Sequence, residues 1–127
     1  MKFCYANRRM TLYPNSVDPW DLAPEDYTNE FLSKVKEMGF DALEIGSDTL
    51  DRTGGSEKSI SEFAKRINDF GLDIGCVRSG GTLTEAKNAP ENIRKMEKSI
   101  NYAKITGAEV VNGAISAPIR YPGSPEG

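Results

Sequence analysis

The sequence predicts an α/β fold in which parallel strands alternate with helices. Three glycines, Gly39, Gly71 and Gly107, each separate a segment with helical periodicity from a short apolar run. Apolar residues that recur every three or four positions indicate a helix with one buried face, and short apolar runs bounded by turn residues indicate buried strands. Strands that are joined through helices run parallel in one sheet, because each helix returns the chain to the end of the sheet where it started.

The composition is that of a globular domain with small or neutral partners. The chain has 127 residues, of which 38% are apolar and 28% are charged, as in an ordinary folded domain. The net charge is −3 without a run of like charge, so we expect neither a nucleic-acid nor a membrane partner. No apolar run approaches the ~20 residues of a membrane span. The N-terminus lacks the apolar stretch of a signal peptide, and we expect a cytoplasmic location.

The two cysteines, Cys4 and Cys76, both lie within apolar runs. Free cysteine is among the most frequently buried residue types. We therefore expect two buried thiols and no disulfide.

The N-terminal part combines a short strand with a long irregular connection. The apolar and aromatic residues 2–6 predict the first strand. Residues 7–27 contain Pro14, Pro19 and Pro24, which exclude regular elements because proline fixes φ and lacks a backbone donor. Connections of this length are usually functional or disordered. Its aromatic residues favour an ordered loop, which is either a lid over a pocket or a plain surface loop.

A first helix and the second strand follow this connection. We predict the helix over residues 29–38, ending at Gly39, and the strand over residues 42–45, because four apolar side chains share one helical face. These side chains are Phe31, Leu32, Val35 and Met38.

A polar turn over residues 46–58 leads to the second helix. We interpret its acidic residues, Asp51 among them, as solvated. Ser59 and Glu62 have the spacing of a capping box, in which hydroxyl and carboxylate each bind a backbone N–H, so the helix is predicted to begin there. The third strand is predicted over residues 72–77. The buried stripe of the helix comprises Ile60, Phe63, Ala64, Ile67 and Phe70.

The third helix is predicted to begin near Pro90, because proline is tolerated in the first turn, and to end at Gly107. The fourth strand covers residues 109–111 and extends to 112 at most. Residues 114–127 are rich in proline and glycine and predict an irregular tail. We expect the helix to bury Ile93, Met96, Ile100 and Ala103.

The spacing of the junctions indicates a barrel. The glycines at 39, 71 and 107 are 32 and 36 residues apart, and eight such units give the ~250 residues of a (β/α)8 barrel. We therefore predict that residues 1–127 form one incomplete TIM-barrel domain, its N-terminal half, with about four parallel strands and three helices. A doubly wound open sheet has the same local pattern and is the competing architecture.

One heptapeptide carries a family resemblance. Residues 39–45, Gly-Phe-Asp-Ala-Leu-Glu-Ile, follow a helix of the form of residues 31–38 and precede the junction Phe70-Gly71-Leu72. This arrangement resembles the N-terminal half of the xylose isomerase-like TIM-barrel superfamily, which includes sugar phosphate isomerases and epimerases. The resemblance implies metal-dependent aldose–ketose isomerisation, or epimerisation next to a carbonyl, of a small sugar or sugar phosphate.

The resemblance also implies a divalent metal, Mn²⁺ or Mg²⁺, whose Glu, Asp and His ligands come from later strands than those of this chain. The chain contains no histidine, and Asn112 stands where the resemblance leads us to expect one. We assign no catalytic and no metal-binding residue, and we expect the chain to be inactive alone.

Four residues are candidates for binding substrate, because the sites of such barrels lie at the carboxyl ends of the strands. They are Asn7, Glu44, Arg78 and Asn112. A carboxylate in a buried strand is costly unless it is paired, so Glu44 contacts substrate, pairs with Arg78, or does both. Arg78 contacts a phosphate or a carboxylate of a ligand through its planar fork, or it is a surface or structural arginine.

Three alternatives remain at this level. The chain is the N-terminal part of a sugar isomerase or epimerase, a half-barrel that completes itself as a homodimer, or a non-catalytic α/β module that binds a small molecule.

Overall fold

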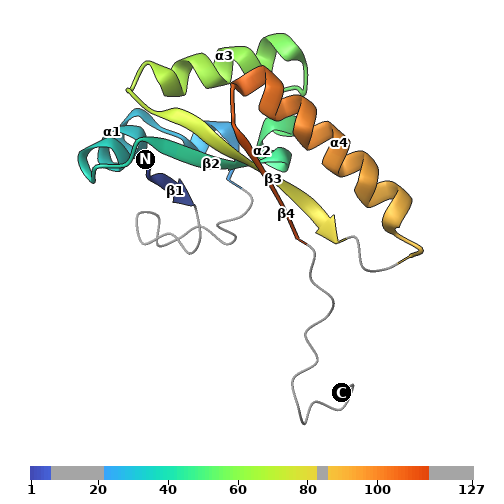
Figure 1. Ribbon diagram of the computed structural model, residues 1–127. Helices are drawn as coiled ribbons and strands as arrows, with labels where there is room; N and C mark the ends of the chain where they lie inside the picture. Colours follow the sequence, from blue (N-terminus) through green and yellow to red (C-terminus); the bar gives the residue numbers. More distant parts are fainter. Residues whose placement is uncertain (7–21, 83–85, 115–127) are drawn as a thin grey trace, which may run out of the picture.

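A computed structural model describes residues 1–6, 22–82 and 86–114. Its centre is a four-stranded, all-parallel sheet with the order β1-β2-β3-β4 (Figure 1). The strands are β1 (Cys4–Ala6), β2 (Ala42–Gly46), β3 (Asp73–Thr82) and β4 (Val110–Ala114). The predicted α/β fold with four parallel strands is therefore confirmed. Within the described residues the sheet is open, with β1 and β4 at its edges.

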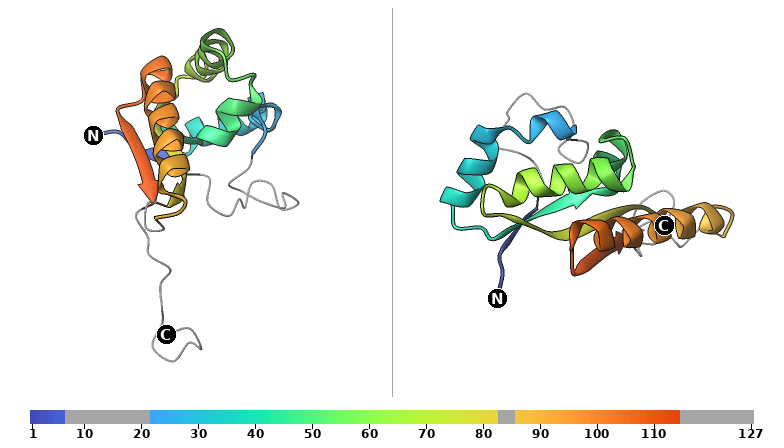
Figure 2. Two further views of the ribbon diagram at one scale, coloured as in Figure 1. Left: turned by 90° about the vertical axis from the view of Figure 1, so that its right-hand side faces the viewer. Right: turned by 90° about the horizontal axis from the view of Figure 1, so that it is seen from above.

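The described connections contain one α-helix more than predicted, α2, and a short 3-10 helix. The helices are the 3-10 helix η1 (Pro24–Asp26), α1 (Asn29–Glu37), α2 (Ser47–Arg52), α3 (Glu57–Asn68) and α4 (Ala89–Thr106). Seen from above, α1, α3 and α4 follow one another across the sheet (Figure 2). None of the described helices combines the length and the apolarity needed to cross a bilayer.

Helix α2 lies where a polar turn was expected. Leu50 is fully buried, and Thr49 Oγ1 donates a hydrogen bond of 2.7 Å to the carbonyl of Leu22. Six residues are too few to show a helical period in the sequence, and packing against the rest of the protein stabilises so short a helix.

The ends of the helices follow local chemistry. Thr28 caps α1, accepting a hydrogen bond of 3.2 Å from the Phe31 N–H, and Gly39, Gly71 and Gly107 have φ of +90°, +76° and +77°. These helix ends were predicted, since glycine adopts positive φ at little cost.

The predicted Ser59–Glu62 capping box is wrong. Ser56 caps α3: its Oγ accepts from the Ser59 N–H at 3.1 Å, and Ser59 Oγ accepts from the Ser56 N–H at 3.2 Å. A serine hydroxyl therefore takes the part that a capping box usually gives to Glu or Gln, and α3 begins at Glu57.

Strand β3 is longer than predicted, so that Arg78 lies within the strand and not in a loop. After a register shift, Thr82 still pairs with Ala114 of β4. The extension passes close to α4, because a Cβ on Gly81 would overlap the side chain of Asn92. Residue 114, which was expected in the tail, ends β4. Residues 115–127 lie outside the described part.

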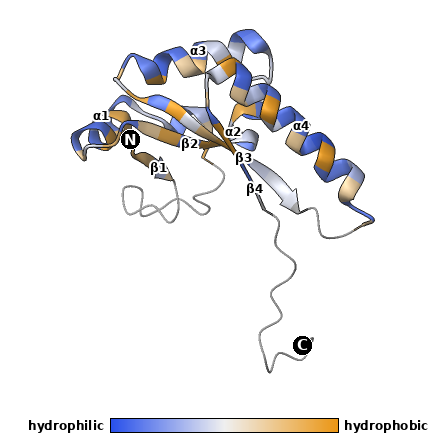
Figure 3. Ribbon diagram, viewed as in Figure 1, coloured by the Kyte–Doolittle hydropathy of each residue, from blue (hydrophilic) through white to orange (hydrophobic). Residues whose placement is uncertain are grey.

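The core lies between the sheet and the helices. Tyr27 packs edge-on against Phe31 and Phe63, with ring centroids 5.6 Å and 5.5 Å away, and Leu22 is also buried. The end of the predicted lid, residues 22–27, is thus anchored in the core and includes η1, a regular element that was not expected. Residues 7–21 of the lid lie outside the described part. In α3 hydrophobic and hydrophilic residues alternate along the ribbon, as expected for a helix with one buried face (Figure 3).

The predicted buried stripe of α4 is wrong in part. Ile93 and Ile100 are 49% and 54% exposed. The buried face of α4 is instead the one that carries Ser99, which is fully buried. The buried residues of α4 are Asn92, Ser99, Tyr102 and Ala103.

Candidate functional site

The two faces of the sheet have different surroundings. Leu43, Ile45 and Val77 belong to the core under the helices. Because side chains alternate along a strand, their neighbours point to the opposite face, which we call the open face. The residues of the open face are Cys4, Ala42, Glu44, Cys76, Arg78, Val110 and Asn112.

Parallel pairing brings three of the four candidate residues together on this face. Glu44 pairs in register with Cys76, and Arg78 pairs with Asn112. Asn7 lies outside the described residues, but Ala6, which precedes it, pairs with Glu44. The structure thus places Glu44, Arg78 and Asn112 in neighbouring rows of the open face, toward the carboxyl ends of β2, β3 and β4.

Glu44 and Arg78 form the ion pair that the sequence suggested. Arg78 Nη1 lies 3.5 Å from Glu44 Oε1, and the two side chains are 16% and 10% exposed. The separation exceeds the roughly 2.7–2.9 Å of a tight charge-assisted hydrogen bond. The pair therefore compensates the buried carboxylate without holding both groups in one fixed geometry. A contact of either residue with substrate stays a prediction.

Asn112 completes this group from β4. It is exposed, and a hydrogen bond from its backbone to the Cys76 thiol opposes the rise of that thiol's pKa. Its side-chain amide offers both donors and an acceptor.

Cys4 and Cys76 are free thiols, as expected, but Cys4 is exposed and Cys76 is only partly buried. The prediction of burial failed because both lie on the open face, where no described helix covers them. The pKa of Cys4 is raised to about 11. Desolvation of the sulfur is the largest cause, followed by the charge interactions with Cys76 and Glu44. Desolvation and Glu44 also raise the pKa of Cys76. Both thiols are thus protonated at neutral pH, and they are poor nucleophiles and metal ligands in that form.

A hollow of about 690 Å³ lies at the amino ends of the strands, where residues of the open face and Asn68 and Thr106, at the ends of α3 and α4, border it. Among the residues that border it, Cys4, Ala42 and Val110 are small or apolar, and Lys2, Asp73 and Glu109 are charged. A ligand pocket has a few convergent polar groups among apolar ones. The charged residues of this hollow lie near the amino ends of the strands, away from Glu44 and Arg78, so the hollow is separate from the group of candidate residues.

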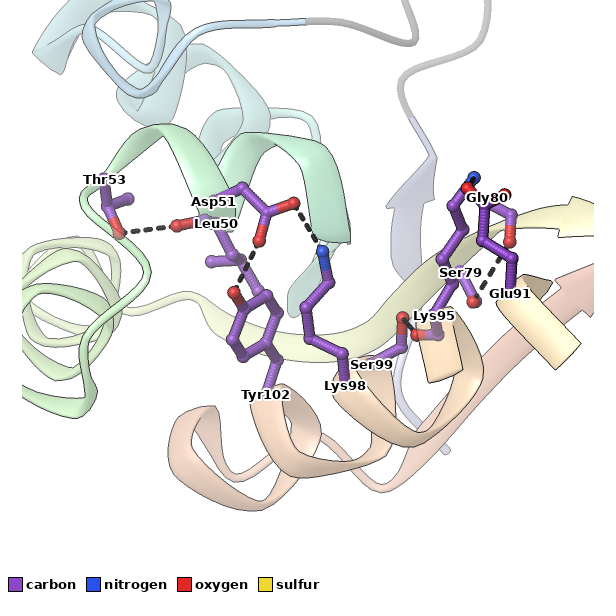
Figure 4. Close-up of polar contacts among 10 residues, drawn as sticks. All are labelled: Leu50, Asp51, Thr53, Ser79, Gly80, Glu91, Lys95, Lys98, Ser99 and Tyr102. Carbon is purple, nitrogen blue, oxygen red and sulfur yellow. Dashed lines mark hydrogen bonds and ion pairs between the residues drawn. The ribbon is translucent and has the colours of Figure 1, made fainter. Parts of the chain in front are cut away.

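A polar cluster that the sequence did not reveal ties α2 to α4 (Figure 4). Asp51 Oδ1 accepts a hydrogen bond of 2.5 Å from the Tyr102 hydroxyl, and Asp51 Oδ2 accepts one of 2.7 Å from Lys98 Nζ. Burial, then the hydrogen bond and charge of Asp51, raise the pKa of Tyr102 to about 12.

The interpretation of Asp51 as a solvated turn residue is therefore wrong. No local pattern could have shown the contact, because Asp51 and Tyr102 are 51 positions apart. Since α2 begins directly after β2, the cluster holds the segment that follows Glu44.

The divalent metal that the resemblance implies finds no fit in this part of the protein. Among residues 1–6, 22–82 and 86–114, no three His, Cys, Asp or Glu side chains gather in a way that could hold a metal ion.

Comparisons with known proteins give no family. No protein-family model matches the sequence, and no curated protein matches it. The similarity to sugar isomerases therefore depends on the heptapeptide and the repeat spacing alone.

Proposed function

We propose that this chain forms the substrate-binding wall of a sugar isomerase or epimerase, with a sugar phosphate as its ligand. The observation that carries the proposal is the Glu44–Arg78 pair on the open face, next to Asn112. All three lie toward the carboxyl ends of neighbouring parallel strands, where α/β barrels place their sites.

The three side chains suit a phosphorylated sugar. A carboxylate accepts hydrogen bonds from hydroxyl groups, and a guanidinium donates to phosphate oxygens. A sugar phosphate carries both hydroxyl and phosphate groups. One such ligand can therefore contact both Glu44 and Arg78, whose charged atoms lie 3.5 Å apart. The amide of Asn112 can bind a further hydroxyl or the carbonyl.

The proposed role is limited to binding and orientation. A divalent metal, when bound, would polarise the substrate oxygens, but the described residues do not form a group that holds one. We therefore assign no proton-transfer step to Glu44, Arg78 or Asn112.

Titration calorimetry tests the proposal with fructose 6-phosphate, fructose and inorganic phosphate. We expect the phosphorylated ketose to bind best, because it engages both charges. Arg78→Gln should weaken its binding about tenfold, the loss of one charge-assisted hydrogen bond, and Glu44→Gln should weaken binding of fructose as well. The matched control is Lys34→Gln, since Lys34 is half exposed and pairs with Glu30 within α1. Equal affinity of all four proteins, or no binding, would contradict the proposal.

A non-catalytic binding module is the second candidate. The site among the described residues consists of groups that bind, a carboxylate, a guanidinium and an amide, without a metal-holding group. In that case the same titration, extended to succinate and other anions without hydroxyls, should show no preference for sugars. A preference for ketose phosphates favours the isomerase class.

A further inference from the structure

We propose that Ser47 is a further residue of the sugar phosphate site and that its hydroxyl donates a hydrogen bond to the phosphate bound by Arg78. The inference deepens the proposed function and rests on it. Three features support it: a buried hydroxyl without a partner, its position next to the row of Arg78, and the firm attachment of α2.

The Ser47 hydroxyl is buried without a hydrogen-bond partner. Ser47 is 4% exposed, and within residues 1–6, 22–82 and 86–114 its Oγ takes part in no hydrogen bond. A buried hydroxyl in this state costs free energy, because it has lost its hydrogen bonds with water and gained none in the protein. Alanine would fill the same space without that cost. The hydroxyl therefore needs a partner that the described residues do not supply.

The other buried serines and threonines of the described part do have partners. Thr49, Ser79 and Ser99 donate to backbone carbonyls at 2.7, 3.4 and 2.9 Å. Thr49 is the closest comparison, since it also lies on α2 and is 1% exposed. Ser47 is thus the exception among the buried hydroxyls.

The position of Ser47 suits a ligand that Arg78 binds. Ser47 is the first residue of α2 and directly follows Gly46, which pairs in register with Arg78. It therefore lies one residue beyond the row of Arg78, at the carboxyl ends of the strands, where barrel sites lie. A phosphate ester has three acceptor oxygens, so a neutral hydroxyl donor can bind one oxygen while the guanidinium binds another.

Contacts on two sides hold α2 in place. Thr49 donates to the carbonyl of Leu22, and Asp51 accepts hydrogen bonds from Tyr102 and Lys98 of α4 (Figure 4). The position of the Ser47 backbone is therefore fixed before a ligand arrives. A group that is already ordered loses little entropy on binding, which favours affinity.

Two competing explanations exist for the Ser47 hydroxyl. Its partner is then a fixed water molecule, or a residue outside the described part of the chain. In both cases the hydroxyl stabilises the free protein, so removing it should lower the stability. A hydroxyl whose partner is a ligand adds no stability to the free protein.

A matched pair of variants separates these explanations. Ser47→Ala and Thr49→Val each remove one buried hydroxyl of α2 and keep the rest of the side chain close to its original shape. In urea unfolding of the free protein, Ser47→Ala should have a midpoint at least as high as the wild type. Thr49→Val should have a lower midpoint, because the carbonyl of Leu22 loses its donor.

Titration calorimetry with fructose 6-phosphate and fructose should show the opposite order. Ser47→Ala should bind fructose 6-phosphate about tenfold more weakly than the wild type, the loss of one hydrogen bond to a charged group, and should bind fructose as the wild type does. Thr49→Val should bind both as the wild type does, because Asp51 still holds α2.

A lower urea midpoint for Ser47→Ala, or an unchanged affinity for fructose 6-phosphate, would overturn the inference. The outcome also separates this inference from the proposed function. If Arg78→Gln weakens the binding of fructose 6-phosphate and Ser47→Ala does not, the proposed site stands without Ser47. If the wild type binds no ketose phosphate, both are wrong.

Discussion

Arg78 on β3 compensates the charge of Glu44 on β2 across the strand boundary, with 3.5 Å between Nη1 and Oε1 and less than a fifth of each side chain exposed. This contact explains how a buried strand carries a carboxylate. It also couples the two residues energetically, because removing one leaves the other charged and desolvated.

We first predict the thermodynamic coupling of this pair. Arg78→Met should lower the free energy of unfolding by about 2–3 kcal/mol, because it leaves the Glu44 carboxylate uncompensated. The double variant Glu44→Gln, Arg78→Met should cost less than the sum of the single variants. Urea unfolding followed by circular dichroism measures all three differences, and strict additivity would show that the pair is not coupled.

A second prediction concerns the approach of β3 to α4. Gly81→Ala should destabilise the protein by about 3 kcal/mol, because the φ of +86° is strained for alanine and the added Cβ meets Asn92. Two glycines serve as controls. Gly39→Ala has a φ of +90° but no atom near the new Cβ, so only the cost of positive φ, about 1–2 kcal/mol, is expected. Gly80→Ala has neither problem and should change stability by less than about 0.5 kcal/mol. Equal losses at positions 81 and 39 would exclude the role of Asn92.

The third prediction is a pH dependence from Tyr102. Its pKa is about 12 in the folded protein and near 10 when unfolded, so the folded state holds this proton more tightly. The stability that Tyr102 adds relative to Tyr102→Phe should be constant below pH 10 and decrease as the pH rises toward 12.

Asp51→Asn provides the control for this titration. It keeps the shape of the contact but removes the carboxylate that raises the pKa of Tyr102. The tyrosinate absorbance of Tyr102, obtained as wild type minus Tyr102→Phe, should then titrate at a lower pH than in the wild type. An unchanged titration would show that Asp51 does not perturb Tyr102.

The fourth prediction concerns the reactivity of Cys4. A pKa near 11 leaves a roughly hundredfold smaller thiolate fraction at pH 8 than the unperturbed thiol has. A more basic thiolate is also a stronger nucleophile, and this recovers about tenfold of the rate that is lost through the smaller thiolate fraction. Alkylation of Cys4 in a Cys76→Ser background should therefore be about tenfold slower than that of a model peptide. Glu44→Gln should accelerate it, because the carboxylate contributes to the raised pKa; a rate equal to that of the peptide would contradict the shift.

Finally, we expect the purified 127-residue chain to show no turnover of ketoses or ketose phosphates with added Mn²⁺. No group of described residues is arranged to hold the ion, and binding groups alone do not move a proton between carbons. A coupled assay over a panel of ketoses measures this directly. Turnover that Glu44→Gln abolishes would overturn the expectation and make Glu44 a catalytic residue.

The sequence alone determined the order of the elements and the parallel sheet. The helical stripe of α1, the junction glycines and the apolar runs of β2 and β3 are local signals, and each acts within a few residues of its position. The same reasoning placed Glu44 and Arg78 on neighbouring strands, because the carboxyl ends of parallel strands meet at one edge.

Contacts between segments that are distant in the sequence decided the presence of α2, the buried face of α4 and the length of β3. Helix α2 is stabilised by burial of Leu50 and by the hydrogen bond from Thr49 to Leu22, and α4 exposes Ile100 while its Tyr102 reaches Asp51 on α2. Neither contact has a signature in the local sequence. The length of β3 was likewise decided by its pairing with β4. Periodicity fixes which residues share a face, but only packing against the neighbouring elements decides which face is buried.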